Sequence, residues 1–140
     1  MARIGRRIAF DYGDVRIGVA ICDPDGILAT PIATLQSKNP ALKNEIAELL
    51  SEYEPVKAYV GNPKLLSGSE GAAVSKVLAF TEFLTKNFDL PITLVDERLS
   101  TVTAARKLRE SGIDSKDARS LIDAAAAVAI LEQGLANESK

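Results

Sequence analysis

The sequence contains no histidine and no tryptophan, and it has one cysteine and one methionine among 140 residues. The absence of histidine excludes Ser-His-Asp and Cys-His catalytic arrangements, and every metal site that uses imidazole. The lone cysteine, Cys22, cannot form an internal disulfide, and its place in an apolar strand pattern predicts a core residue. Enzymatic chemistry must therefore come from carboxylates, hydroxyls, Lys, Arg or Tyr.

Long apolar runs and a strong charge bias are also missing. The longest apolar stretch, Ala124 to Leu131, has eight residues, and no apolar core of signal-peptide length follows the basic N-terminus. The 17 basic and 19 acidic residues give a net charge of −2, which argues against a general nucleic-acid coat protein but allows a local basic patch. We expect one domain over residues 1–140, cytoplasmic and without membrane contact.

The first apolar run, Ile8 to Phe10, ends abruptly in Asp11, and a turn containing Gly13 leads to a second run, Ile17 to Cys22. Two such runs joined by a short turn predict a hairpin in which Gly13 supplies a positive φ. Asp11 then lies at the carboxyl end of a central strand, where open α/β sheets place their active sites. Alternatively, Asp11 only caps the turn through backbone hydrogen bonds.

The remaining pattern predicts a third antiparallel strand and then alternating helices and strands. The third strand covers Ile27 to Leu35, with Pro31 marking an edge or a bulge. The later strands are expected over 56–60 and 91–95, and the helices over 41–54, 74–88, 101–112 and 116–134. The second helix should bury Val74, Val77, Leu78, Thr81, Leu84 and Phe88, and residues 137–140 should form a frayed tail.

This order predicts an α/β fold with a mixed five-stranded sheet. A three-strand antiparallel meander continues into two parallel strands through two crossover units, with helices on both faces of the sheet.

Carboxylates carry the clearest chemical signal. The first and last predicted strands end in acid, at Asp11 and at Asp96-Glu97, and parallel neighbours would bring these ends together. Asp123 is the only polar residue from Leu121 to Leu131, so its charge in an apolar helix needs a cation, a metal or a proton. Three carboxylates without imidazole suit Mg²⁺ or Mn²⁺, and two such ions can support phosphodiester hydrolysis.

Four segments, in order, resemble the motifs of the YqgF family, which is also called RuvX. These segments are Asp11 to Ala20, Val60 to Pro63 with Gly68, Asp96 to Thr101 with Ala104, and Ile122-Asp123 followed by alanines. The resemblance spans residues 7–131 and implies an RNase H-like fold similar to RuvC-type junction resolvases. It implies that Asp11, Glu97 and Asp123 are the metal-binding catalytic acids. Asn62 departs from the commoner residue of the family.

The resemblance favours a metal-dependent nuclease that uses Mg²⁺ or Mn²⁺, as two ions, in 5′-end maturation of precursor 16S rRNA. Its partner would be structured RNA, and the alternative is a Holliday junction resolvase acting on branched DNA. A non-catalytic nucleic-acid-binding or ribosome-assembly module would need no metal. An actin-like ATPase also opens with an Asp-x-Gly turn, but 140 residues are too few for its second lobe.

Several basic residues are candidates for nucleic-acid binding. Arg98 is a candidate for bidentate phosphate contact. Arg16 either contacts phosphate at the mouth of the site or orients Asp11. A locally basic stretch would hold a nucleic-acid backbone or would simply be a solvated face, and it comprises Arg106, Lys107, Arg109, Lys116 and Arg119.

Other candidates also have structural alternatives. The loop that begins at Gly61 and contains Pro63 and Gly68 is either a phosphate cradle or an ordinary surface connection. Glu97 has the alternative of pairing with Arg98 or Lys107 at the surface. For Asp123 the alternative is a buried salt bridge, for example to Arg16.

Overall fold

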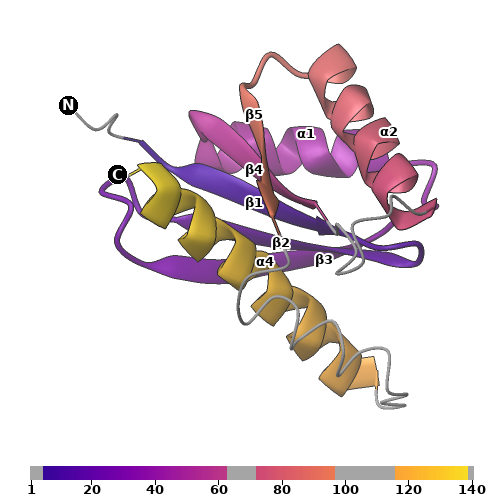
Figure 1. The fold of residues 1–140 in the computed structure, drawn as a ribbon. Coiled ribbons are helices and arrows are strands. Elements are labelled where there is room, and N and C mark those ends of the chain that lie inside the picture. The colour runs from indigo at the N-terminus through magenta and orange to yellow at the C-terminus, as the bar shows by residue number, and fades with distance from the viewer. Residues whose placement is uncertain (1–4, 63–71, 97–115, 139–140) are drawn as a thin grey trace.

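The structure, a computed structural model, describes residues 5–62, 72–96 and 116–138 (Figure 1). Its elements are β1 (Arg7–Tyr12), β2 (Arg16–Cys22), β3 (Ala29–Gln36), α1 (Leu42–Tyr53), β4 (Lys57–Asn62), α2 (Ala72–Asn87), β5 (Ile92–Asp96) and α4 (Lys116–Glu138). The helix predicted over 101–112 lies outside the described residues. Within the described ranges, no helix is long and apolar enough to cross a membrane.

The five strands form one mixed sheet in the order β3-β2-β1-β4-β5. The pairs β1–β2 and β2–β3 are antiparallel, whereas β1–β4 and β4–β5 are parallel. The predicted meander and its continuation into two parallel strands are therefore confirmed. Pro31 lies in edge strand β3, where the register shifts opposite Val19 and Ala20, so the predicted edge or bulge is also confirmed.

The third strand begins at Ala29 rather than at Ile27. Asp23 Oδ1 accepts hydrogen bonds from the backbone N–H groups of Ile27, at 2.7 Å, and Leu28, at 3.2 Å. These bonds lower the pKa of Asp23 and hold both apolar residues in the turn, where their side chains are exposed. The turn chemistry of an aspartate thus outweighs the strand preference of two aliphatic residues.

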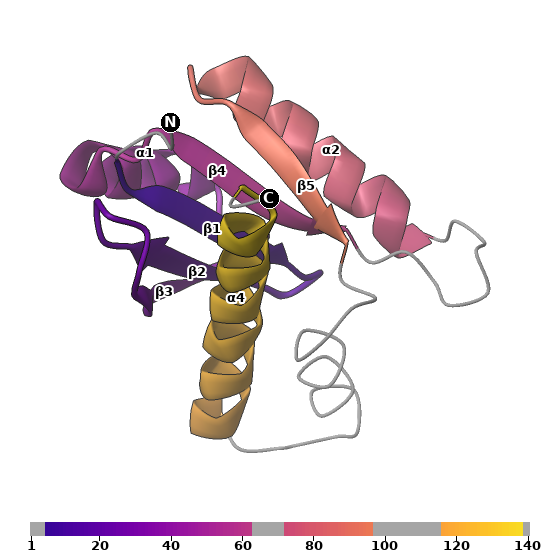
Figure 2. The same cartoon turned by 60° about the vertical axis from the view of Figure 1, so that its left-hand side comes forward.

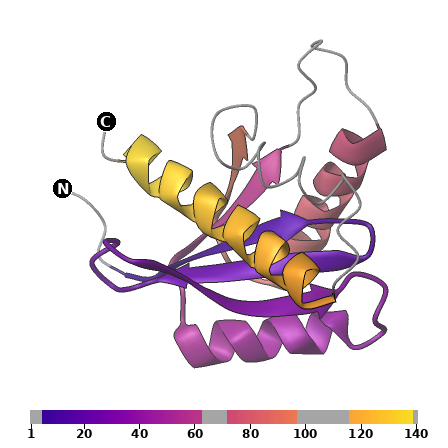
Figure 3. The same cartoon turned by 90° about the horizontal axis from the view of Figure 1, so that it is seen from below.

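Helices cover both faces of the sheet, as predicted. Figures 1 and 3 show α4 on one face and α1 on the other, and Figure 2 shows α4 crossing the sheet over β1, β2 and β3. Because successive side chains of a strand point to opposite faces of the sheet, β1 contributes to the hydrophobic cores on both faces. Ile8 and Phe10 pack in the cluster that includes residues of α1 and α2, whereas Ala9 packs in the cluster that includes α4.

A buried arginine, Arg7, begins β1, and the lone cysteine, Cys22, ends the neighbouring strand β2 beside it. Cys22 is 1% exposed, which confirms its predicted place in the core, and its Sγ accepts a hydrogen bond from the Arg7 backbone N–H. Burial raises the pKa of the Cys22 thiol. The Arg7 side chain donates through Nη2 to Glu138 Oε1 at 3.0 Å, so the last turn of α4 is tied to the start of β1.

Small residues let α4 approach the sheet closely. Ala126 and Ala127 are fully buried, and a Cβ built on Gly134 would lie 2.7 Å from the ring of Tyr59. The helix is not buried on every side, however, because Ala125 is exposed. It also continues to Glu138, beyond the predicted end near 134.

The inward face of α2 differs from the predicted stripe at one position. Leu78 is 46% exposed, whereas Phe80 is buried at 5% exposure beside Val77 and Leu84. The ring of Phe80 packs edge-on against Phe10, with centroids 5.7 Å apart. The helix α2 is therefore turned so that Phe80 faces the sheet and Leu78 faces solvent.

We expect Gly134→Ala to destabilise the protein by about 1–3 kcal/mol, because the new methyl group overlaps the Tyr59 ring. At an exposed helical site the same exchange would stabilise by about 1 kcal/mol. Urea unfolding of Gly134→Ala, Tyr59→Leu and the double variant measures the coupling between the two positions. A gain in stability for Gly134→Ala, or additive effects, would contradict this close contact.

Candidate active site

Asp11 is the best-defined candidate residue. It lies near the end of β1, and its side chain is 0% exposed. Ala9 packs in the cluster that includes α4, so strand alternation turns Asp11 toward the same face. The structure thus confirms the placement of this carboxylate at the carboxyl edge of the central strand.

Glycines flank Asp11 on both neighbouring strands. Gly18 of β2 is its register partner, and Gly61 of β4 follows Val60, the partner of Phe10. No side chain therefore stands directly beside the carboxylate on either neighbouring strand at this register position. Gly61 itself is a buried strand residue, so its predicted place in the loop is wrong.

The turn after Asp11 is held by several polar contacts. Gly13 does not adopt a positive φ, contrary to prediction. It is needed for space, because a Cβ there would lie 2.7 Å from the carbonyl oxygen of Arg16. The Gly13 N–H donates to that same oxygen at 2.9 Å, and the hydroxyl of Ser37 donates to the Gly13 carbonyl.

Asp14, in the same turn, forms an exposed ion pair with α2. Lys76 Nζ lies 2.8 Å from Asp14 Oδ1, which lowers the pKa of the aspartate and raises the pKa of the lysine. Both side chains are more than half exposed, so the pair contributes little to stability. This arrangement supports a structural rather than a catalytic role for Asp14.

Arg16 begins β2 and is half-buried. It lies two residues from Gly18, the register partner of Asp11, so alternation places it on the Asp11 face. This position suits both a phosphate contact and an orienting role toward Asp11.

Two polar residues end the neighbouring strands. Asn62 and Asp96 are register partners at the carboxyl ends of β4 and β5. In the described part of the chain, Asn62 Oδ1 is buried without a hydrogen-bond partner, so this edge holds an acceptor ready for a donor. The only signal in the sequence was that Asn62 departs from the family pattern.

The remaining candidates cannot be placed in full. Asp123, Lys116 and Arg119 lie in α4, but only their backbone is described. The candidates outside the described residues are Pro63, Gly68, Glu97, Arg98, Arg106, Lys107 and Arg109. Among the described residues, no three Asp, Glu or Cys side chains form a group able to hold a metal ion.

Comparisons with solved structures show the fold. Thermus thermophilus RuvC in complex with a Holliday junction substrate superposes with a TM-score of 0.61 at 13% identity, covering 96% of both chains. Fowlpox virus resolvase, solved with Holliday junction DNA, gives a TM-score of 0.56 at 15% identity and covers 96% of this chain and 99% of its own. The predicted RNase H-like fold is thereby confirmed.

Sequence comparisons identify much closer relatives. A Streptomyces coelicolor protein named "putative pre-16S rRNA nuclease" is 54% identical over 138 residues, which cover 97% of this chain and 83% of the relative. A Rhodococcus opacus protein of the same name is 49% identical, covering 97% and 80%. The family model RuvX, described as Holliday junction resolvase, matches residues 5–137. The chain therefore belongs to the RuvX family.

Proposed function

We propose that this protein is a nuclease that hydrolyses phosphodiester bonds of precursor 16S rRNA in the cytoplasm. The observation that carries the proposal is the buried Asp11 carboxylate, flanked by glycines at the carboxyl edge of the sheet. Membership of the RuvX family, and relatives that carry the name of pre-16S rRNA nuclease, support this activity.

Asp11, Glu97 and Asp123 form the proposed catalytic set. The end of α4 is tied to Arg7 at the start of β1, so the helix runs back along the sheet and its earlier turns lie toward the carboxyl end of β1. Position 123 precedes the buried Ala127 by one helical turn. Glu97 directly follows β5, the parallel neighbour of β4. The topology therefore supports convergence of the three acids.

Divalent metal ions are the proposed cofactors. Carboxylate oxygens are hard ligands, and a fully buried carboxylate such as Asp11 fits Mg²⁺ or Mn²⁺. When bound, the ions supply a water of lowered pKa and stabilise the leaving oxygen. The protein would hold them through Asp11, Glu97 and Asp123, while Arg16 and Arg98 would bind or orient phosphate.

Holliday junction resolution is the second candidate, because the family description and both superposed structures name it. The deciding experiment compares cleavage of precursor 16S rRNA and a four-way DNA junction with Mg²⁺, with Mn²⁺ and with chelator. Selective cleavage of the RNA supports the first candidate. Metal-independent binding without cleavage of either substrate would indicate a non-catalytic module.

Activity should require Mg²⁺ or Mn²⁺ and disappear on chelation, because carboxylates are the proposed ligands. Asp11→Asn should lower cleavage by orders of magnitude, whereas the same exchange at Asp25, exposed in the β2–β3 turn, should not. Gel-based cleavage of labelled substrate measures both variants. Full cleavage in excess chelator would contradict the two-metal mechanism.

Asp123→Asn should separate function from stability. Cleavage should fall by orders of magnitude, while the metal-free protein keeps or gains stability, because repulsion among three acids is relieved. Added Mg²⁺ should stabilise the wild type more than the variant. Thermal unfolding with and without metal tests this. Strong destabilisation without metal, together with equal stabilisation by metal, would instead identify a structural salt bridge.

Simultaneous replacement of Arg106, Lys107 and Arg109 by alanine should weaken substrate binding and reduce its salt dependence. Single-turnover cleavage of bound substrate should change much less, since these residues are not proposed ligands. Binding titrations at several salt concentrations measure the effect. Unchanged affinity and salt slope would assign the stretch to a solvated surface.

A further inference from the structure

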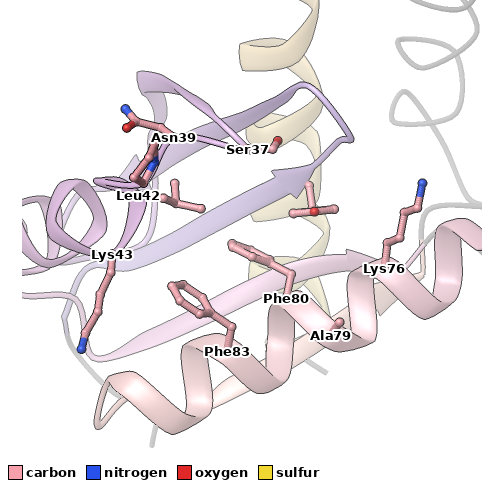
Figure 4. A pocket seen from close by; sticks show the side chains of 10 residues that line it. Ser37, Asn39, Leu42, Lys43, Lys76, Ala79, Phe80 and Phe83 are labelled. Carbon is pink, nitrogen blue, oxygen red and sulfur yellow. The ribbon is translucent and has the colours of Figure 1, made fainter.

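A groove lies between α1 and α2, on the sheet face opposite the side chain of Asp11 (Figure 4). Its volume of about 410 Å³ is within the range of ligand pockets, about 300–1,000 Å³. Aromatic, aliphatic and cationic side chains line it, and the lining consists of Tyr12, Ser37, Asn39, Pro40, Leu42, Lys43, Lys76, Ala79, Phe80 and Phe83.

Three nearly parallel rings form one wall of the groove. The ring centroids of Tyr12 and Phe80 are 4.8 Å apart at an interplanar angle of 30°, and those of Phe80 and Phe83 are 6.2 Å apart at 20°. Phe80 is buried, whereas Tyr12 and Phe83 are only half-buried. The two outer rings therefore offer apolar surface to a planar ligand.

Two lysines line the groove. Figure 4 shows Lys43 and Lys76 at opposite ends, with Phe80 and Phe83 between them. None of the described lining residues carries a carboxylate. The charge of Lys76 is compensated by its ion pair with Asp14, whereas Lys43 forms no ion pair with the described residues. Glu45, near Lys43, accepts a hydrogen bond from Asn39. Lys43 is thus the cation of the lining that is available to an anionic ligand.

The groove is connected to the candidate active site through the β1–β2 hairpin. Tyr12 directly follows Asp11, and alternation turns the two side chains to opposite faces of the same strand. Ser37, which also lines the groove, donates to the carbonyl of Gly13 in the hairpin turn. The groove and Asp11 therefore lie on opposite faces of the same end of β1.

We propose that this groove binds a single-stranded segment of the RNA substrate, next to the bond that is cut. Unpaired bases pack against the exposed parts of Tyr12 and Phe83, and a flanking phosphate contacts Lys43. Aromatic platforms combined with cations are the usual means of holding single strands. The inference rests on the proposed nuclease function, which would otherwise leave this second face without a role.

The first test replaces one ring without emptying the core. Phe83→Leu should weaken binding of a labelled single-stranded RNA oligonucleotide about tenfold, the size expected for one lost stacking contact. Tyr53→Leu is the matched control, because Tyr53 is also a half-buried aromatic residue on the same cluster but does not line the groove. Thermal unfolding verifies that both variants fold. Equal affinities of the two variants would overturn the proposal.

The second test removes charge. Lys43→Ala should reduce the slope of log K against log salt by about 0.7, as for one lost phosphate contact to a single strand. Lys86→Ala, an exposed lysine of α2 outside the lining, should leave the slope unchanged. A fully paired RNA duplex should bind both variants equally, since it has no free base to stack. Loss of duplex binding in Lys43→Ala alone would overturn the single-strand assignment.

Both tests are run in chelator, so no cleavage is needed and failure of the nuclease proposal remains distinguishable. A 4-thiouridine in the oligonucleotide should crosslink to the peptides that contain Tyr12 or Phe83. Crosslinks confined to other peptides would overturn the proposal even if the protein cleaves RNA. Crosslinks at the groove in a protein that cleaves neither RNA nor a DNA junction would uphold the groove and overturn the nuclease.

Discussion

The close approach of α4 to the sheet is the contact on which the rest of the structure depends. Alanines and one glycine bring the helix backbone against β1, β2 and β4, and Gly134 lies directly over the ring of Tyr59. A helix with larger side chains on this face would stand farther from the strands. The small residues thus set the distance between two proposed catalytic elements as well as burying apolar surface.

Because side chains alternate along β1, the two proposed functions lie on opposite faces of the sheet. Asp11 turns toward α4 and Tyr12 turns toward α2, so a single step along β1 separates the proposed chemistry from the proposed base-binding groove. The hairpin turn joins them, because its backbone is held by Ser37 and its Asp14 is paired with Lys76. The β1–β2 turn, held by the contacts of Ser37 and Lys76, is therefore next to both faces.

Features that depend on local pattern were predictable from the sequence. The mixed five-stranded sheet, the carboxylate at the end of β1 and the burial of Cys22 follow from apolar periodicity and turn residues. Features that depend on contacts between distant segments could not be predicted from the sequence. Gly13 is required by the nearby carbonyl oxygen of Arg16, Phe80 replaces Leu78 because a ring fits against Phe10, and Gly61 continues β4 instead of opening the loop. Such requirements appear only when strands are paired.

The burial of Cys22 has a practical consequence for spectroscopy. Its sulfur accepts a hydrogen bond from the Arg7 backbone, burial raises the pKa of the thiol, and the residue is 1% exposed, so alkylating reagents do not reach it in the folded protein. A cysteine introduced on the surface would therefore be the sole reactive thiol without any prior removal of the native one. The fold thus supplies a ready background for attaching a fluorophore or a spin label at a single chosen position.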